Sequence, residues 1–505
     1  MDFKLYKRGY LISKKPIVFK NTEFKLTDWA SKKFNQYFIY HDPLMNFTTQ
    51  KQNGVEIFIL GIILDPYNKW INNAAILDRC CLLLKASESD FWDYIDTLSE
   101  RFILFAKTDQ LCFVIQDAAG NRSLFYTIDD SNTFLSSHSE LIADIQNESI
   151  SRDALEFMSQ PGFKKNNNRY FPGRFTPYQN IFSLTPNTLL HVDDGKIERF
   201  FPRSESESFK VNPGLLDELE YLLKTQVQLL SEEYNLAVSL TAGIDSRLTL
   251  ASCRENLQGI FAYTYVVDEL TKQDSHIASL LSDKLDVPHK TWNCRKDLEE
   301  GFTGKFLKNT SLVSTSYRAR IARMLLNKYP ADHLHLKSNM PDIMKAHYKK
   351  KFAFLPDQSS SFIFSRLYGI CNNSKFVVNA FEDFISVTQL KKEMVYNYDL
   401  YDLFYWEHRI GAYQSLSLCE WDIAQDSYIL FNNREILKRM IQIPLRDRIK
   451  FRLYYRLIEH MCPEISGIKI NPHKKDKISK KIFRLIRGAS LRYQATFNKE
   501  SNFIA

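Results

Sequence analysis

Short apolar runs alternate with segments of helical periodicity in the second half of this 505-residue chain. Strands are predicted at Leu236–Leu240, Ile260–Val267 and His333–Leu336, and helices at Leu215–Leu230, Ser246–Glu255 and Asp274–Leu285. Such alternation is typical of βαβ units, whose strands form a parallel sheet. The chain from Asn212 onward is therefore predicted to be a doubly wound α/β domain.

The residues from about 36 to 200 follow a different pattern, with short apolar or alternating runs that indicate a mainly antiparallel layer. The expected strands are Tyr37–Tyr40, Val55–Leu64, Phe102–Phe105, Leu111–Ile115, Leu124–Thr127 and Thr188–Val192. Helices are expected at Ala74–Leu84 and Asp90–Glu100. This part is predicted to be an α+β, β-rich domain.

A polar stretch, SESES, follows Phe201-Pro202 and has the composition of a linker. We place the domain boundary there, with one domain over residues 1–205 and the second over 206–505. Beyond about residue 380 the pattern is helical, without detectable repeats. A chain of 505 residues with 44% apolar residues can bury the cores of two or more domains.

Composition limits the compartment and the partners. The chain has no run of 18 apolar residues, and its first 20 residues lack the apolar region of a secretory signal, so a soluble, cytoplasmic protein is expected. Its eight cysteines show no CxxC pair, which favours reduced thiols over a sulfur metal site. The formal net charge of +8 names no partner by itself.

The stretch NLAVSLTAGIDSRLTL, from Asn235 to Leu250, contains the most informative turn. Ligands of open parallel sheets bind beyond the carboxyl ends of strands, where helix N-termini present free amide groups to anions. Gly243 would let the backbone approach a phosphate, and Asp245 could hold magnesium on it. The turn is neither a Walker loop nor a Rossmann fingerprint. The alternative is an ordinary strand-to-helix turn capped by Asp or Ser.

This turn resembles the SGGxDS pyrophosphate loop of the ATP-pyrophosphatase superfamily, in the form found in asparagine synthetases and their relatives. The resemblance implies an adenine nucleotide α-hydrolase-like fold that binds ATP and Mg²⁺ and adenylates a carboxylate. It assigns phosphate contacts to Thr241, Gly243 and Ser246, and magnesium and catalysis to Asp245. The remaining loop residues assigned to the ATP site are Ala242, Ile244 and Arg247; Thr241, Ala242 and Arg247 depart from the family pattern.

A second segment, LKSNMPDIMKAHY from Leu336 to Tyr348, is similar to the family's LSGEGxDExFxGY segment. The resemblance makes Asp342 the second magnesium ligand and assigns Ser338 and Asn339 to the ATP site. Two carboxylates from different βα turns could hold a magnesium ion that bridges phosphates. Ser338 and Met340 replace glycines, and Ile343 replaces a glutamate. The alternative for Asp342 is an exposed loop carboxylate. Thr264, on the next strand, is assigned to the adenine side.

The N-terminal part is similar to class II glutamine amidotransferase domains, which are Ntn-like. The matching segments are Asp117 to Arg122 with the following Leu124-Phe125-Tyr126, Phe134 to Glu140, and Ile181 to Phe201. The family's nucleophile is an N-terminal cysteine, whereas Met1 is followed here by Asp2. We therefore expect no glutaminase activity from this domain.

Two further cations are assigned to catalysis by resemblance. Arg409 lies in a stretch that lines the acceptor side in relatives, where it could bind a carboxylate. Lys450 and Arg448 precede Pro463 at about the spacing of the family's adenylate-binding lysine, and Lys450 is our assignment. A surface ion pair for Arg409 and a solvated helix face for Lys450 are the alternatives.

The function expected from these features is an ATP-dependent amide-forming ligase that adenylates a carboxylate and transfers it to ammonia or an amine. An ammonia-dependent asparagine synthetase and a non-catalytic scaffold are the alternatives; retention of Asp245, Ser246 and Asp342 argues against the scaffold. The changed second loop favours an acid other than aspartate. The basic tail, His473 to Lys499, suits an anionic membrane or a solvated end. No nucleic-acid-binding module is visible, and the oligomeric state, a homo-oligomer included, stays open.

Overall fold

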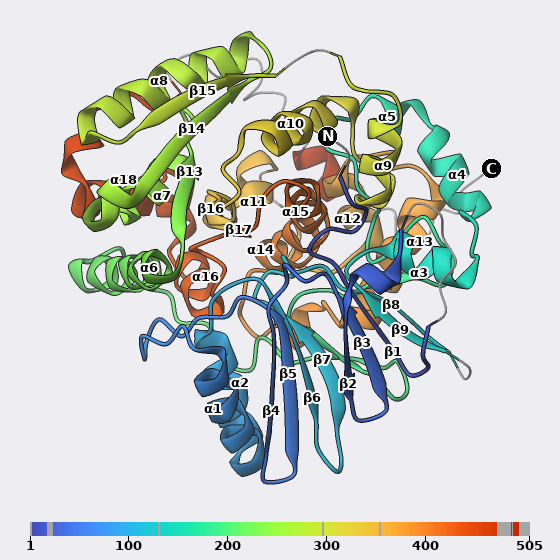
Figure 1. Cartoon of the computed structure of the whole chain (residues 1–505). Coiled ribbons are helices and arrows are strands. Elements are labelled where there is room, and N and C mark those ends of the chain that lie inside the picture. Colours follow the sequence, from blue (N-terminus) through green and yellow to red (C-terminus); the bar gives the residue numbers. More distant parts are fainter. Residues whose placement is uncertain are drawn as a thin grey trace.

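The computed structural model describes residues 3–17, 24–129, 132–294, 297–352, 355–471, 486 and 488–493 (Figure 1). Asp2 and most of the basic tail lie outside these residues. In the described part of the chain, no helix is both long and apolar enough to cross a membrane.

The N-terminal part contains two six-stranded sheets, and every strand pairing within them is antiparallel. The first has the order β10 (Phe182–Ser183), β8 (Phe125–Ile128), β9 (Thr133–Ser136), β1 (Tyr10–Ser13), β3 (Tyr37–His41) and β2 (Ala30–Phe34). The second has the order β12 (Ile197–Arg199), β11 (Thr188–His191), β7 (Cys112–Gln116), β6 (Phe102–Lys107), β5 (Val55–Gly61) and β4 (Phe47–Gln52).

The two sheets pack face to face through one apolar layer, to which Ile12 and Ile39 contribute from one sheet and Phe58 and Phe105 from the other. Helices α1 (Asn73–Ala86) and α2 (Glu88–Thr97) cover the outer face of the second sheet, and α3 (Ser139–Gln146) packs on the first. The antiparallel prediction is confirmed. The sequence pattern indicated a single antiparallel layer, whereas the structure has two stacked sheets. Strands such as β6, whose residues are apolar on both faces, are covered on both sides.

The C-terminal part is built on a five-stranded sheet whose strands are all parallel. Its order is β15 (His289–Asn293), β14 (Ile260–Val266), β13 (Asn235–Ser239), β16 (His333–Leu336) and β17 (Ser427–Tyr428). Alternate residues of β13 face opposite layers, as the strand pleat requires. Leu236 and Val238 pack with α6 (Pro213–Glu233), α7 (Ile244–Ser252) and α8 (Glu269–Leu285), while Ala237 faces α10 (Ser316–Lys328) and α15 (Ser415–Asp422). Helices therefore cover both faces, as predicted.

The remaining elements are short connecting helices and the helical C-terminal part. They are η1 (Leu26–Asp28), α4 (Arg152–Ser159), α5 (Pro161–Lys164), η2 (Arg254–Gly259), α9 (Phe302–Lys308), η3 (Pro341–Lys345), α11 (His347–Lys351), α12 (Ser361–Tyr368), α13 (Lys375–Thr388), η4 (Lys392–Met394), α14 (Leu400–Phe404), η5 (Tyr405–Gln414), α16 (Arg434–Ile441), α17 (Leu445–Ile449), α18 (Arg452–Met461) and η6 (Pro463–Ile465).

Buried ion pairs join the N-terminal sheets to the C-terminal helices. Both terminal nitrogens of Arg101 lie 2.7 Å from the two carboxylate oxygens of Asp422, and both side chains are buried. Arg199 makes a similar two-bond contact with Glu407 of η5, at 2.6 and 2.8 Å. The largest apolar cluster also runs through both parts. Charged groups on each side of the expected domain boundary thus depend on the other side for their partners.

Candidate functional site

The turn after β13 is closed by its own hydroxyl groups. The Thr241 and Ser246 Oγ atoms lie 3.0 Å apart, and the Gly243 amide donates to Thr241 Oγ1 at 3.1 Å. The Thr241 amide donates to Ser246 Oγ at 3.1 Å, and the Ala242 amide donates to Asp274 Oδ1 at 3.1 Å. A phosphate that used these amide groups would have to replace those side-chain acceptors.

Helix α7 begins directly after this turn and has no side-chain cap. Gly243 is its N-cap residue, and Ile244 and Asp245 form its first turn. The amide groups at a helix N-terminus lack intrahelical acceptors and favour a negative charge. The predicted strand, turn and helix order is therefore present, with donors directed beyond the carboxyl edge of the sheet.

The structure brings the side chains of Asp245 and Asp342 together. The strands that precede them, β13 and β16, are parallel neighbours, so their carboxyl ends meet at one edge. Between the two side chains lies the ammonium of Lys345, with Nζ 2.7 Å from Asp245 Oδ2 and 2.5 Å from Asp342 Oδ1. Burial and the neighbouring Asp342 charge raise the pKa of Asp245. Burial alone would lower the pKa of Lys345, but Asp342 and Asp245 raise it above its ordinary value.

Arg448 holds the turn that carries Asp342. Its Nε donates to the Met344 carbonyl oxygen at 3.0 Å, and its Nη2 donates to that of Ile343 at 3.0 Å. The third nitrogen, Nη1, lies 2.5 Å from Asp402 Oδ2, which balances the buried charge. Arg448 thus positions the second turn, while Lys450, two residues later, is exposed at the end of α17.

Met340 has a backbone conformation that side chains usually avoid. Its φ is 75°, in the region that favours glycine, although a methionine stands there. A non-glycine residue in that region costs on the order of 1–3 kcal/mol and persists only where its surroundings fix it. Met340 is buried, and its sulfur accepts a hydrogen bond from Asn121 Nδ2 at 3.2 Å. The second loop therefore makes a glycine-like turn with a methionine at this position.

The two carboxylates suit a hard divalent cation in donor chemistry. Carboxylate oxygens are the ligands that Mg²⁺ prefers, and Asp245 Oδ1 is buried with no hydrogen-bond partner in the described part of the chain. A cation there would have to displace the Lys345 ammonium. Within the described residues, the one group of three His, Cys, Asp or Glu side chains with ligand atoms close enough for a shared ion lies elsewhere, at Asp217, Glu220 and His460.

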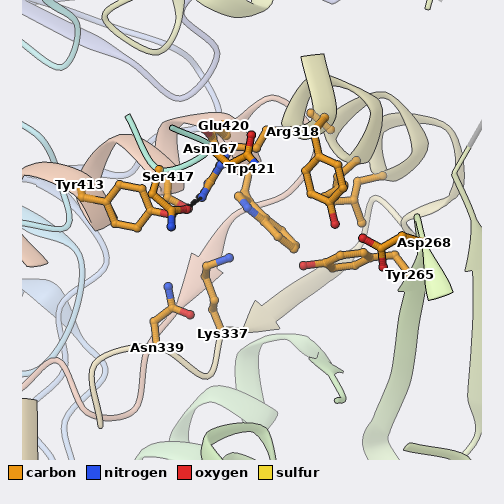
Figure 2. A pocket seen from close by; sticks show the side chains of 15 residues that line it. Asn167, Tyr265, Asp268, Arg318, Lys337, Asn339, Tyr413, Ser417, Glu420 and Trp421 are labelled. Atoms are coloured by element: carbon orange, nitrogen blue, oxygen red, sulfur yellow. Dashed lines mark hydrogen bonds and ion pairs between the residues drawn. The ribbon is translucent and has the colours of Figure 1, made fainter. Parts of the chain in front are cut away.

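A cavity of about 450 Å³ lies at the same edge of the sheet, on the face covered by α10 and α15 (Figure 2). Lys337 and Asn339, from the loop that continues to Asp342, form part of its wall. The other lining residues are Asn167, Asn168, Tyr265, Asp268, Tyr317, Arg318, Ile321, Ala322, Leu325, Tyr413, Ser417, Glu420 and Trp421. Of this wall, the sequence had assigned only Asn339 to a site. The indication in the sequence that Lys337 belongs to this site is its position directly after the strand β16.

Thr264 and Ser338 lie on the two elements that flank the first turn. Thr264 Oγ1 donates to the Leu240 carbonyl oxygen at 2.9 Å, directly before the turn, and lies 2.9 Å from His289 Nε2. Ser338 Oγ is buried and has no partner within the described residues. Ser338 therefore offers an unused hydroxyl between the cavity residues and Asp342.

Two assigned cations have partners of their own. Arg247 is buried, and its guanidinium donates to carbonyl oxygens of Ile465, Ile468 and Lys469. It would have to give up these bonds to reach a phosphate at the turn. Arg409 lies over the rings of Tyr413, at 3.7 Å, and Tyr170, at 5.2 Å. It stacks on a residue of the cavity wall and does not itself line the cavity.

None of the eight cysteines has the features of an activated nucleophile. All are free thiols, and burial raises the pKa of each one. Thiolate, rather than thiol, is the reactive form. These thiols are therefore poorly suited to glutamine hydrolysis.

No protein-family model matches the sequence, and no curated protein matches it. Among solved structures, glutamine phosphoribosylpyrophosphate amidotransferase from B. subtilis, complexed with ADP and GMP, is 11% identical, with 68% of this chain and 71% of that chain covered and a TM-score of 0.22. A structure described as the allosteric regulatory enzyme of purine biosynthesis is 11% identical over 66% and 68% of the two chains, with a TM-score of 0.23. Similarity at these TM-scores assigns neither fold nor function.

Proposed function

We propose that the chain is an ATP-dependent ligase that activates a carboxylate as an acyl-adenylate and transfers the acyl group to ammonia or an amine. The observation that carries this proposal is the meeting of Asp245 and Asp342 at the carboxyl edge of the parallel sheet. The uncapped start of α7 and a cavity of about 450 Å³ lie at the same edge. Acidic side chains beside free helix amides suit a magnesium-bound polyphosphate.

In the proposed reaction, a carboxylate oxygen attacks the α-phosphorus of ATP, and the bond to pyrophosphate breaks. The amine then attacks the acyl carbon, and AMP leaves. The amide groups at the start of α7, with Thr241 and Ser246, would orient the phosphates. Asp245 and Asp342 would hold Mg²⁺, which neutralises phosphate charge. Lys345, once released from the two carboxylates, would supply an ammonium for the charge that develops on pyrophosphate.

One observation favours a second candidate, a non-catalytic scaffold. Lys345 already satisfies both aspartates without any ligand, and the hydroxyls of the first turn already occupy its amides. A site that had lost its ligand would be stable in this arrangement. The two candidates differ in a simple respect, because only the ligase releases pyrophosphate.

Exchange of labelled pyrophosphate into ATP, measured with a panel of carboxylates, tests the proposal. Replacement of Asp245 by asparagine should lower the exchange rate by about 100-fold or more, since it removes one of the two carboxylates that would hold the magnesium ion on the phosphates. Asp286→Asn, at the left-handed end of α8, is the matched control and should have no effect. Equal exchange in Asp245→Asn and the unmodified chain would show that the site assignment is wrong.

The identity of the acid separates the ligase from the asparagine synthetase. We expect exchange with a carboxylate other than aspartate. Robust exchange and asparagine formation with aspartate and ammonia would favour the ammonia-dependent asparagine synthetase instead. No exchange with any acid, together with no ATP binding, would favour the scaffold.

A further inference from the structure

Lys337 is a buried lysine at the carboxyl end of β16. Its side chain forms part of the cavity wall, and the residue is 7% exposed. The backbone amide of Lys337 donates to the Tyr428 carbonyl oxygen at 2.7 Å, which continues the sheet toward β17 and fixes the start of the side chain. The main chain of Lys337 is thus fixed at the cavity wall.

Within the described residues, the ammonium of Lys337 lies over an aromatic ring and is paired with no carboxylate. Its Nζ lies 3.4 Å from the centre of the Trp421 ring, and it makes no hydrogen bond or ion pair within the described residues (Figure 2). A cation–π contact offsets only part of the cost of removing an ammonium from water. Burial accordingly lowers the pKa of Lys337 to about 7. Among the described residues, no anion is bonded to this ammonium.

The acids of the cavity wall already have partners. Glu420 is paired with Arg318 at 2.7 Å and accepts a hydrogen bond from Ser314 at 2.5 Å. Asp268 caps α8 by accepting the Thr271 amide at 2.9 Å. Neither acid is bonded to the Lys337 ammonium, so an anion that entered the cavity could form the direct ion pair that these acids do not make.

The aromatic residues of the cavity wall indicate which shape of ligand fits beside Lys337. Four aromatic residues line the cavity: Tyr265, Tyr317, Tyr413 and Trp421. The volume of about 450 Å³ falls within the range of about 300–1,000 Å³ that is usual for small-molecule sites. Aromatic walls favour a flat ligand that stacks on them.

We propose that this cavity binds a small organic carboxylate with a flat, unsaturated body, and that Lys337 forms the ion pair with its carboxylate. Binding needs no ATP, so it is independent of the proposed ligase activity. If the chain is a ligase, this ligand belongs to the class of acids that it activates.

Binding should depend on pH through the Lys337 ammonium. The groups that face it are Glu420 and Asp422 on α15, Arg318 on α10, Arg101 before β6, His335 on β16, and the cavity residues Asp268, Tyr265, Tyr317 and Tyr413. Below the pKa of about 7 the ammonium is present in the free chain, and above it the amine must first take up a proton. Affinity should therefore fall as the pH rises through this pKa, with proton uptake on binding.

Calorimetric titration of the full chain with benzoate and with its neutral analogue benzamide tests the proposal. Benzoate should bind roughly 10- to 100-fold more tightly than benzamide, as expected for a hydrogen bond to a charged group. Lys337→Met should remove this preference. Lys290→Met is the matched control, because Lys290 also lies over an aromatic ring, that of Phe261, but is exposed and outside the cavity.

Proton uptake gives a readout that needs no variant. Titrations above the pKa of Lys337, in buffers of different ionisation enthalpy, should report uptake with benzoate and none with benzamide. The proposal is overturned if benzoate does not bind, if both probes bind equally, or if benzoate binding takes up no proton. It is also overturned if Lys337→Met keeps the preference, or if Lys290→Met loses it.

Discussion

Replacing Lys345 with methionine would leave the Asp245 and Asp342 carboxylates facing each other without a cation. Both oxygens contact the same nitrogen, at 2.7 and 2.5 Å, so they lie no more than about 5 Å apart. Methionine keeps the length of the side chain and removes its charge. The expected result is a less stable chain that has gained a place for a divalent cation.

The size of the loss follows from charge repulsion. Two negative charges about 5 Å apart repel by about 3 kcal/mol at an effective dielectric constant of about 20. The side chain of Asp342 is 51% exposed, so solvent reduces this to about 1–2 kcal/mol. In a chain of this size, a loss of that order lowers Tm by about 1–4 °C.

The loss should depend on pH and on magnesium. The pKa of Asp245 is already raised, and loss of Lys345 raises it further. Because the pKa of this carboxyl is raised in the folded chain, stability is lost as the pH rises through that pKa. The stability difference between Lys345→Met and the unmodified chain should therefore shrink toward acid pH. Magnesium at about 100 times its dissociation constant would add about 2.7 kcal/mol, enough to cancel the repulsion.

The assay is thermal unfolding of Lys345→Met and the unmodified chain, with EDTA or with excess magnesium chloride. Magnesium should raise the Tm of the variant and leave the unmodified chain unchanged, because Lys345 occupies the site there. Lys438→Met is the matched control, since Lys438 pairs with the single carboxylate of Glu435 at 3.1 Å. This reasoning would be refuted if Lys345→Met had the same Tm as the unmodified chain in EDTA at neutral pH. It would also be refuted if magnesium changed the Tm of all three proteins equally.

Two further predictions concern other parts of the molecule. Arg101→Met should destabilise the chain by about 3 kcal/mol, because it removes both short contacts to the buried Asp422 carboxylate and leaves it with Arg122 at 3.9 Å. A thermal scan that shows less than about 1 °C of change would contradict the role given to this pair. The purified chain should release no glutamate from glutamine, since burial raises the pKa of every thiol, and release that a thiol alkylator blocks would show otherwise.

The sequence predicted the parallel sheet well where strands are apolar. The expected bounds of His333–Leu336 match β16, and the predicted helix after Leu240 is α7. Strand β15, HKTWN, was missed because it is an edge strand in which only Trp292 is buried. The helix expected at Asp274 begins five residues earlier, at Glu269, where an Asp268 capping box outweighs the polar composition of the first turn.

The site was predictable only in part. Two acids that follow two parallel strands can be paired from the sequence, because the sheet order brings strand ends together. Lys345 and Lys337 could not be selected in the same way, because a lysine in a loop is usually solvated. Their partners, Asp245 and Trp421, lie about 100 and 84 residues away in the chain, and packing alone brings them close. The roles of Arg247 and Arg448 in binding carbonyl groups are equally invisible in a linear pattern.

The π-helix η5 acts as a spacer between two parts of one long helical rod. Its residues fix the rod to the N-terminal sheets, since Trp406 Nε1 donates to the Ala118 carbonyl oxygen at 2.7 Å and Glu407 pairs with Arg199. Each wide turn takes in one residue more than an α-turn. Deletion of one residue there would turn one wide turn into an α-turn and leave the helices on either side in nearly the same phase. The same deletion in α15, ahead of Trp421, would rotate that ring by about 100° and carry it out of the cavity wall, so η5 is the segment of the rod whose length can change while the shape of the cavity is kept.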